Sequence, residues 1–223
     1  MKTKAVIFDF DGTLTTSNDD IWEKLYHKIG MSTDINSNYC LFYKKFKSGE
    51  FDYFQWCDAC VQDYINVGLT KALFESAASE ISLLSDAEEV FKFFHDNGIK
   101  LYVLSGNIAE AIKFILGDNL KYFEDICANE FYFEANGSLN HVITTKYDFE
   151  KKADYVLKIK EELNVQVNEI CFIGNGENDV YVHKSGATTI CINPINADEE
   201  NKNKWDYVVK DTKNLKDILK YIN

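Results

Sequence analysis

The chain contains no arginine and has a single proline, at position 194. All 24 of its positively charged residues are lysines, against 36 acidic residues, so the formal net charge is −12. Because nucleic-acid binding depends on clustered positive charge, we expect no nucleic-acid partner. Arginine is also the usual bidentate ligand for carboxylates and phosphates, so lysine must supply the positive charge of any anion site.

Long apolar runs are missing as well. The first apolar run covers residues 5–8 and is closed by Asp9, so it fits neither a signal peptide nor a membrane span. Six cysteines are scattered through 223 residues, a pattern typical of free thiols in a reducing compartment. We therefore expect a cytoplasmic protein without a membrane partner, as a monomer or a homodimer.

Short apolar runs that end at glycine or a polar residue predict buried parallel strands. They cover residues 4–10, 100–104, 169–173 and 188–192, with a weaker run at 207–209. Helical patterns cover residues 108–116, 152–163, 179–184 and 214–221. This alternation predicts an α/β fold with a Rossmann-like parallel sheet. Ligands of such sheets bind at the carboxyl ends of the strands.

Residues 15–85 have a different character, because their pattern is helical and dense in aromatic residues. A segment of this length is too long for a loop. We interpret it as a small helical cap inserted into a core formed by residues 1–14 and 86–223. Within the core, residues 127–144 alternate around Asn136-Gly137, which is a strong signal for a hairpin turn.

Asp9 and Asp11 stand at the end of the first predicted strand, and Gly12 follows them. Two carboxylates that face one cleft can divide the work of phosphoryl transfer. One attacks phosphorus, and the other protonates the leaving oxygen and later deprotonates water. The alternative is a strand that ends in an acidic turn, since Asp-Gly is a common turn pair.

Ser105 and Gly106 end the second predicted strand, where a hydroxyl and free backbone N–H groups could bind a phosphate. A plain helix N-cap explains a serine there equally well. Lys151 and Lys152 stand at the start of the predicted helix of residues 152–163, against the direction of its dipole, which suggests a nearby anion. For any single lysine, a solvated surface position remains the alternative.

Asn175 and Asp179 belong to a glycine-rich turn after the third predicted strand. Their oxygens are suitable ligands for a hard metal ion and its water. The glycine spacing lacks the full dinucleotide-binding pattern, so we reject that interpretation.

Taken in this order, the four elements resemble the haloacid dehalogenase superfamily, and within it the phosphoserine phosphatase-like branch. The resemblance implies that Asp9 is the nucleophile and Asp11 the general acid/base. It implies that Ser105, Gly106 and Lys152 bind the phosphoryl group, with Lys151 as the alternative lysine. A Mg²⁺ ion would be held by four residues of the chain: Asp9, Asp11, Asn175 and Asp179.

Two departures from this family stand out. Asn175 occupies a position where the family usually has aspartate. Three explanations of this asparagine compete: a natural variant that works through Asp179, an engineered trap, or a weakened enzyme. We favour the first. In the cap, Asn18 stands where phosphoserine phosphatases have a glutamate for the substrate amine, and no arginine is present for the substrate carboxylate. We therefore expect a substrate other than phosphoserine.

The sequence thus predicts a Mg²⁺-dependent phosphatase that hydrolyses a small-molecule phosphate monoester through an aspartyl-phosphate. Two alternatives remain open. A phosphomutase of the same fold would return the phosphoryl group to its substrate. A weakly active sensor of phosphate ligands would have lost turnover through Asn175.

Overall fold

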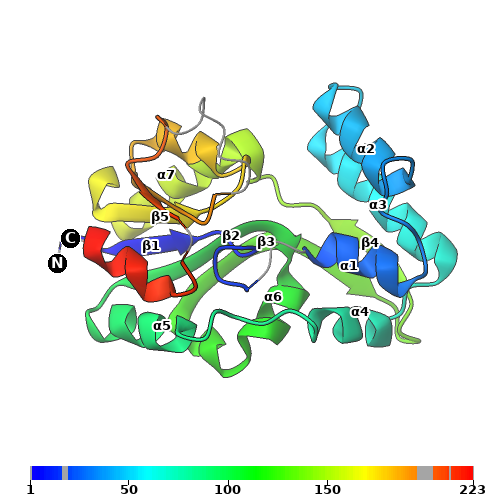
Figure 1. Ribbon diagram of the computed structural model, residues 1–223, viewed down its shortest axis with the longest axis horizontal. Coiled ribbons are helices and arrows are strands. Elements are labelled where there is room, and N and C mark those ends of the chain that lie inside the picture. The colour runs from blue at the N-terminus through cyan, green and yellow to red at the C-terminus, as the bar shows by residue number, and fades with distance from the viewer. Residues whose placement is uncertain (1, 17–19, 195–202, 211, 223) are drawn as a thin grey trace.

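The computed structural model describes residues 2–16, 20–194, 203–210 and 212–222. Its centre is a seven-stranded sheet in the order β4-β3-β2-β1-β5-β6-β7, with helices on both faces (Figure 1). The strands are β1 (Ala5–Phe8), β2 (Lys100–Ile108), β3 (Phe123–Phe133), β4 (Leu139–Ile143), β5 (Ile170–Gly174), β6 (Thr188–Ile192) and β7 (Tyr207–Val209). Neighbouring strands are parallel except β3 and β4. The predicted α/β fold with a Rossmann-like parallel sheet is confirmed.

Helices cover both faces of the sheet and also lie beyond the ends of its central strands. The α-helices are α1 (Ile21–Lys28), α2 (Asn38–Lys47), α3 (Tyr53–Val67), α4 (Lys71–Ala78), α5 (Ala87–Asp96), α6 (Ala109–Leu116) and α7 (Lys152–Leu163). Figure 1 shows α5 and α6 below the sheet and α7 above it, whereas α2 and α3 lie beyond the ends of the central strands.

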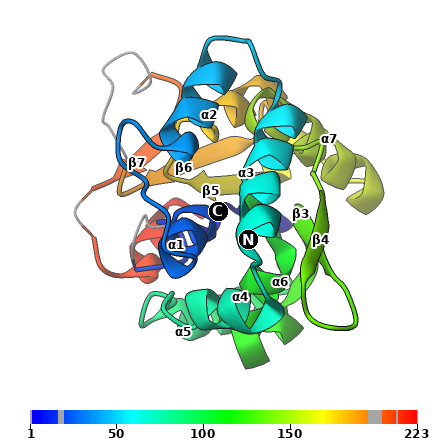
Figure 2. The same ribbon diagram turned by 90° about the vertical axis from the view of Figure 1, so that its right-hand side faces the viewer.

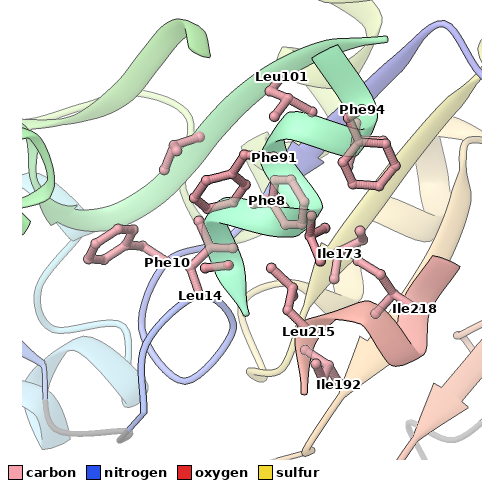
Figure 3. Close-up of a cluster of buried hydrophobic side chains, with 14 of the residues drawn as sticks. Phe8, Phe10, Leu14, Phe91, Phe94, Leu101, Ile173, Ile192, Leu215 and Ile218 are labelled. Carbon is pink, nitrogen blue, oxygen red and sulfur yellow. The ribbon is translucent and has the colours of Figure 1, made fainter. Parts of the chain in front are cut away.

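Strand β1 is buried on both faces, and its side chains alternate between two cores. Phe8 packs against Phe91 and Phe94 of α5 in the cluster drawn in Figure 3. Ile7 points the other way, into a cluster that contains Val156 and other residues of α7. Burial of one such side chain contributes about 1.5–3 kcal/mol, so both faces anchor the strand that ends at Asp9.

Helices α1 to α4 are the inserted segment, and the sequence marks each of their starts. Asp20, Ser37, Asp52 and Thr70 are the N-caps, and the side chain of each accepts a hydrogen bond from a backbone N–H of the first turn. In α3, Asp52 and Gln55 complete a reciprocal capping box.

The predicted hairpin is present as β3 and β4, whose connection includes Gly137 at a φ of 85°. Strand β3 pairs with β2 and then continues into the hairpin, which lies beside α3 (Figures 1 and 2). Phe131 and Leu139 of the hairpin join Tyr64 and Phe74 of the inserted helices in one hydrophobic cluster. The boundaries of core and cap stay a prediction, and the hairpin contacts the cap side.

Two predicted helices have a different form from the one expected. The sequence predicts helices over residues 179–184 and 214–221, and the structure forms 3₁₀-helices there, η4 (Val180–Ser185) and η5 (Leu215–Tyr221). Both are short segments of six and seven residues, and the 3₁₀ form is confined to short segments. Strand β2 also extends four residues beyond the predicted end at Leu104, because β3 continues to pair with it through Ile108.

Candidate active site

The register of the sheet brings three strand ends to one level. Phe8 of β1 pairs with Val103 of β2 and Ile173 of β5, so the residues that follow these three positions emerge side by side. They open into a cavity of about 420 Å³ between the sheet and the inserted helices. Five of the seven predicted site residues line this cavity: Asp9, Asp11, Ser105, Gly106 and Asn175. The remaining two, Lys152 and Asp179, lie directly behind Asp9.

Lys152 is the first residue of α7, and its side chain is fully buried. Its ammonium group donates to Asp9 Oδ1 at 3.0 Å and to Asp179 Oδ1 at 2.5 Å. Burial alone lowers the pKa of Lys152, but the charges of Asp179, Asp9 and Asp148 outweigh it and raise that pKa. Lys152 therefore keeps its positive charge beside the Asp9 carboxylate.

Asp9 itself is 5% exposed. Burial and the charge of Asp179 raise the pKa of Asp9 to about 7, although Lys152 acts in the opposite direction. Lys151, the alternative lysine, has a side chain that is 67% exposed, and it pairs with Asp154 at 3.2 Å. Of the two predicted lysines, Lys152 is the one that contacts Asp9.

Asp179 is engaged on both oxygens. Oδ1 accepts from Lys152, and Oδ2 accepts from the backbone N–H groups of Asn175 and Gly176 at 3.0 and 2.9 Å. The turn can approach this closely because Gly174 has no side chain, and a Cβ there would lie 2.5 Å from Asp179 Oδ2. Asp179 thus holds Lys152 and the turn together, and its part in metal binding stays a prediction.

Asp11 is oriented by a residue to which the sequence analysis gave no role. The side-chain amide of Asn107 donates to both Asp11 oxygens, at 2.8 and 2.9 Å. Burial, followed by the charges of Asp20 and Asp9, raises the pKa of Asp11 well above its usual range. A carboxyl group in this environment is suited to carry a proton.

The loop of Ser105 and Gly106 is held from two sides. The carbonyl of Gly106 accepts from Trp22 Nε1 of α1 at 3.0 Å and from Asn129 Nδ2 of β3 at 2.7 Å. Asn129 in turn reaches the hydroxyl of Tyr53 at 3.0 Å. Core and inserted helices therefore meet at this carbonyl, and the loop is fixed by both.

Asp148 is a second residue that sequence reasoning missed. It lies 3.7 Å from Lys152, and its Oδ1 accepts from Asn178 Nδ2 at 3.0 Å. A Cβ on Gly106 would lie 2.4 Å from Asp148 Oδ2, so the carboxylate touches the predicted phosphate loop. The signal available in the sequence was an aspartate four residues before Lys152, a spacing that brings the two side chains together at a helix start.

Two of the cysteines also belong to this cavity. Cys57 and Cys60 are buried free thiols in the cavity wall, and all six cysteines are free. Asn18 lies outside the described residues. No helix in the described part of the chain is both long and apolar enough to cross a membrane.

Comparisons with known proteins identify the family of this chain. The family model of the haloacid dehalogenase-like hydrolases matches residues 3–182. The chain belongs to this family. It is similar to the phosphoserine phosphatase of Campylobacter jejuni subsp. doylei, with 26% identity over 98% of this chain and 99% of that protein. The predicted superfamily, its phosphoserine phosphatase-like branch and the predicted enzyme class, a phosphomonoesterase, are confirmed.

Solved structures show the same fold. An apo phosphoserine phosphatase superposes with a TM-score of 0.78 at 22% identity, over 99% of this chain and 100% of that one. A phospho-aspartyl intermediate analogue of phosphoserine phosphatase gives a TM-score of 0.76 at 23% identity, with full coverage of both chains. At these identities the likeness establishes the fold of this haloacid dehalogenase-like hydrolase.

Phosphatases of the haloacid dehalogenase-like family generally use Mg²⁺. Asp9, Asp11 and Asn175 line one cavity and present only oxygen donors, which suits a hard cation that keeps several waters. Among the described residues, no group of three or more His, Cys, Asp or Glu side chains is arranged to hold a metal by itself. The donor set fits Mg²⁺ when the amide of Asn175 takes part, with one carboxylate fewer than the family pattern.

Proposed function

We propose that this phosphatase hydrolyses a small-molecule phosphate monoester in a Mg²⁺-dependent reaction, with Asp9 as the nucleophile. The observation that carries the proposal is the buried contact of 3.0 Å between Asp9 Oδ1 and the Lys152 ammonium, directly behind the cavity wall. A carboxylate beside a fixed cation can receive a phosphoryl group while the added negative charge is neutralised.

In the first step, an Asp9 oxygen bonds to phosphorus as the ester P–O bond breaks, and Asp11 gives its proton to the leaving alkoxide. In the second step, Asp11 takes a proton from water, whose oxygen attacks phosphorus and releases phosphate and free Asp9. The two hydrogen bonds from Asn107 support this assignment, because they aim the Asp11 carboxyl group.

Ser105, the Gly106 N–H and Lys152 would hold the transferring phosphoryl group. Asp9, the backbone carbonyl of Asp11 and Asn175 would hold Mg²⁺, with Asp179 as a further candidate ligand. The bound ion would supply positive charge to the phosphoryl oxygens. The chain needs that charge, because the protein as a whole carries a net charge of −12.

The relatives described above are phosphoserine phosphatases, but we propose a different substrate for this chain. Phosphoserine carries a carboxylate, and no arginine is available to bind it. We also propose a cytoplasmic enzyme, monomeric or homodimeric, that acts without nucleic acid or membrane. The six free cysteines support a reducing compartment.

The test is release of phosphate from p-nitrophenyl phosphate during a Mg²⁺ titration. We expect activity that requires Mg²⁺, and a loss of about 10³-fold or more in kcat in Asp9→Asn. Acid quenching with ³²P-labelled substrate should place the label on the peptide that contains Asp9. Undiminished turnover in Asp9→Asn would refute the mechanism.

Asn175→Asp is the second arm of this experiment. It restores a carboxylate beside the proposed ion, so half-maximal activity should need less Mg²⁺. If only Asn175→Asp hydrolyses the ester while the wild type merely binds it, the protein is a phosphate-ligand sensor. An isomerised phosphate ester in place of free phosphate would identify a phosphomutase.

A further inference from the structure

The cavity above Asp9 has an aromatic wall, defined here as its seven lining rings. They are Trp22, Tyr39, Tyr43, Tyr53, Trp56, Phe149 and Trp205. Several of them pack against one another, with ring centroids 5.4 Å apart for Tyr43 and Trp56 and 5.9 Å apart for Tyr53 and Phe149. Such contacts join four of the seven rings, those of Tyr43, Tyr53, Trp56 and Phe149, into one packed group.

Phe149, one of the seven rings, has an unusual backbone conformation. Its φ of 47° lies in the left-handed region, which is unfavourable for a bulky residue. Such conformations persist only when the surroundings impose them, and they gather at ligand sites. The ring is clamped by Phe46 of α2 at a centroid distance of 4.8 Å, and its N–H donates to Asp148 Oδ1 at 2.8 Å. One strained turn therefore presents both an aromatic ring and a carboxylate to the cavity.

Asp148 is fixed at the edge of the phosphate loop. Its side chain is 4% exposed and held by Asn178, while its Oδ2 lies against Gly106. A group that contacts this carboxylate must therefore be joined to the phosphate by only a few atoms. The chemistry that a buried carboxylate accepts there is a hydrogen-bond donor or a cation.

The charges around the cavity favour the cation. Besides the Asp11 carboxyl group, which carries the proton, four carboxylates lie in or directly behind its wall, namely Asp9, Asp20, Asp148 and Asp179. They face one buried ammonium, that of Lys152. Glu177 at the rim is paired with Lys47, and Lys210 lies at an exposed position. A divalent ion and a phosphate dianion cancel each other, so the occupied cavity keeps its negative excess. An anionic leaving group would be repelled.

Resting on the phosphatase function above, we propose that the leaving group of the substrate is a short alcohol bearing an organic ammonium. The ammonium group lies between the Asp148 carboxylate and the rings of Tyr53, Trp56 and Phe149. Aromatic faces attract such cations through their quadrupole, most strongly where water is excluded. The site then discriminates by the charge of the alcohol, with Asp148 and the aromatic wall as its specificity-determining groups.

The experiment compares esters of similar shape and different charge. Phosphocholine and phosphoethanolamine are the cationic probes, 3,3-dimethylbutyl phosphate is the neutral isostere of phosphocholine, and phosphoglycolate is the anionic probe. We expect kcat/KM for the better cationic probe to exceed that of the neutral isostere by about tenfold or more. The value for phosphoglycolate should be the lowest. A primary ammonium favoured over a quaternary one would identify hydrogen bonding to Asp148 as the larger contribution.

Two variants test which side chains distinguish the charge of the leaving group. In Asp148→Asn and Phe149→Leu, the ratio of kcat/KM for the cationic and neutral probes should fall toward one. Because both probes share the phosphoryl chemistry, a general loss of catalysis cancels in this ratio. Phe114→Leu is the matched control, since Phe114 is 49% exposed on α6 and is not part of the aromatic wall.

The outcomes separate the two proposals. Hydrolysis of p-nitrophenyl phosphate with equal or greater preference for the neutral or anionic probe overturns the ammonium substrate and leaves the phosphatase standing. Failure to hydrolyse any ester overturns the phosphatase, and the substrate proposal with it. Where a variant does not fold, the wild-type ratio alone decides.

Discussion

Lys152 Nζ lies 3.0 Å from Asp9 Oδ1, although the two residues are 143 positions apart in the chain. The same ammonium also contacts Asp179 and Asp148. One buried cation thus holds three carboxylates that come from three separate segments. Breaking such a cluster is costly, because the charges left behind have no water to solvate them.

Replacement of Lys152 should therefore damage both stability and turnover. We expect Lys152→Met to lower the free energy of unfolding by about 3–5 kcal/mol and to abolish phosphate release. Lys151→Met is the neighbouring control, and its exposed ion pair predicts a change within about 0.5 kcal/mol. Urea unfolding and the p-nitrophenyl phosphate assay measure the two effects. Equal effects of the two substitutions would contradict the assignment of Lys152.

Asp9 should make the metal-free protein less stable as pH rises. Its pKa is raised from 3.8 to about 7 in the folded state, so between these values the folded protein binds more protons than the unfolded chain. Stability from this group is present at low pH and is lost as pH rises toward about 7.

Asp9→Asn removes this ionisation while keeping the shape of the side chain. In EDTA at pH 8, we expect it to raise the melting temperature by a few degrees, where about 1 kcal/mol corresponds to about 2–4 °C for a chain of this size. Scanning fluorimetry from pH 5 to pH 8 measures the effect, and the variant should show a flatter pH dependence. Parallel curves for the two proteins would rule out Asp9 as the cause.

Gly106 should tolerate no side chain. The Cβ of Gly106→Ala would lie 2.4 Å from Asp148 Oδ2 and 3.3 Å from the Tyr53 hydroxyl, so the phosphate loop must shift. We expect a loss of about 1–3 kcal/mol in stability and a large fall in kcat/KM. In the double variant Gly106→Ala/Asp148→Ala the clash is relieved, so the stability losses should be less than additive. A strictly additive double-mutant cycle would argue against this contact.

The buried thiols should resist alkylation in the folded protein. Burial raises the pKa of Cys60 to about 12 and that of Cys191 to about 12, and the thiolate is the reactive form. Iodoacetamide at pH 8 should label partly exposed Cys40 first. Partly exposed Cys127, whose pKa is raised by burial, should follow more slowly, and the four buried thiols should react only after unfolding. Mass spectrometry follows each site, and Cys40→Ser should remove the fast phase. Rapid native labelling of Cys60 or Cys191 would contradict the packing.

Much of the site could be predicted from local pattern. The strand that ends at Asp9 is a short apolar run, and the starts of α1 to α4 carry capping residues whose effect does not depend on distant contacts. Asn107, Asn129 and Asp148 were not assigned a role, because each acts through a partner from another element. The 3₁₀ form of residues 180–185 was also missed, since helical periodicity does not separate it from a short α-helix.

By itself the sequence determined the α/β class, the candidate nucleophile Asp9 and the lack of an arginine for an anionic substrate. These follow from residue type and from periodicities that span a few positions. Only the tertiary structure decided between Lys151 and Lys152, turned Asp179 toward that lysine and placed Asp148 against Gly106. The physical reason is that such contacts depend on the register of β1, β2 and β5 and on the direction in which α7 leaves the sheet.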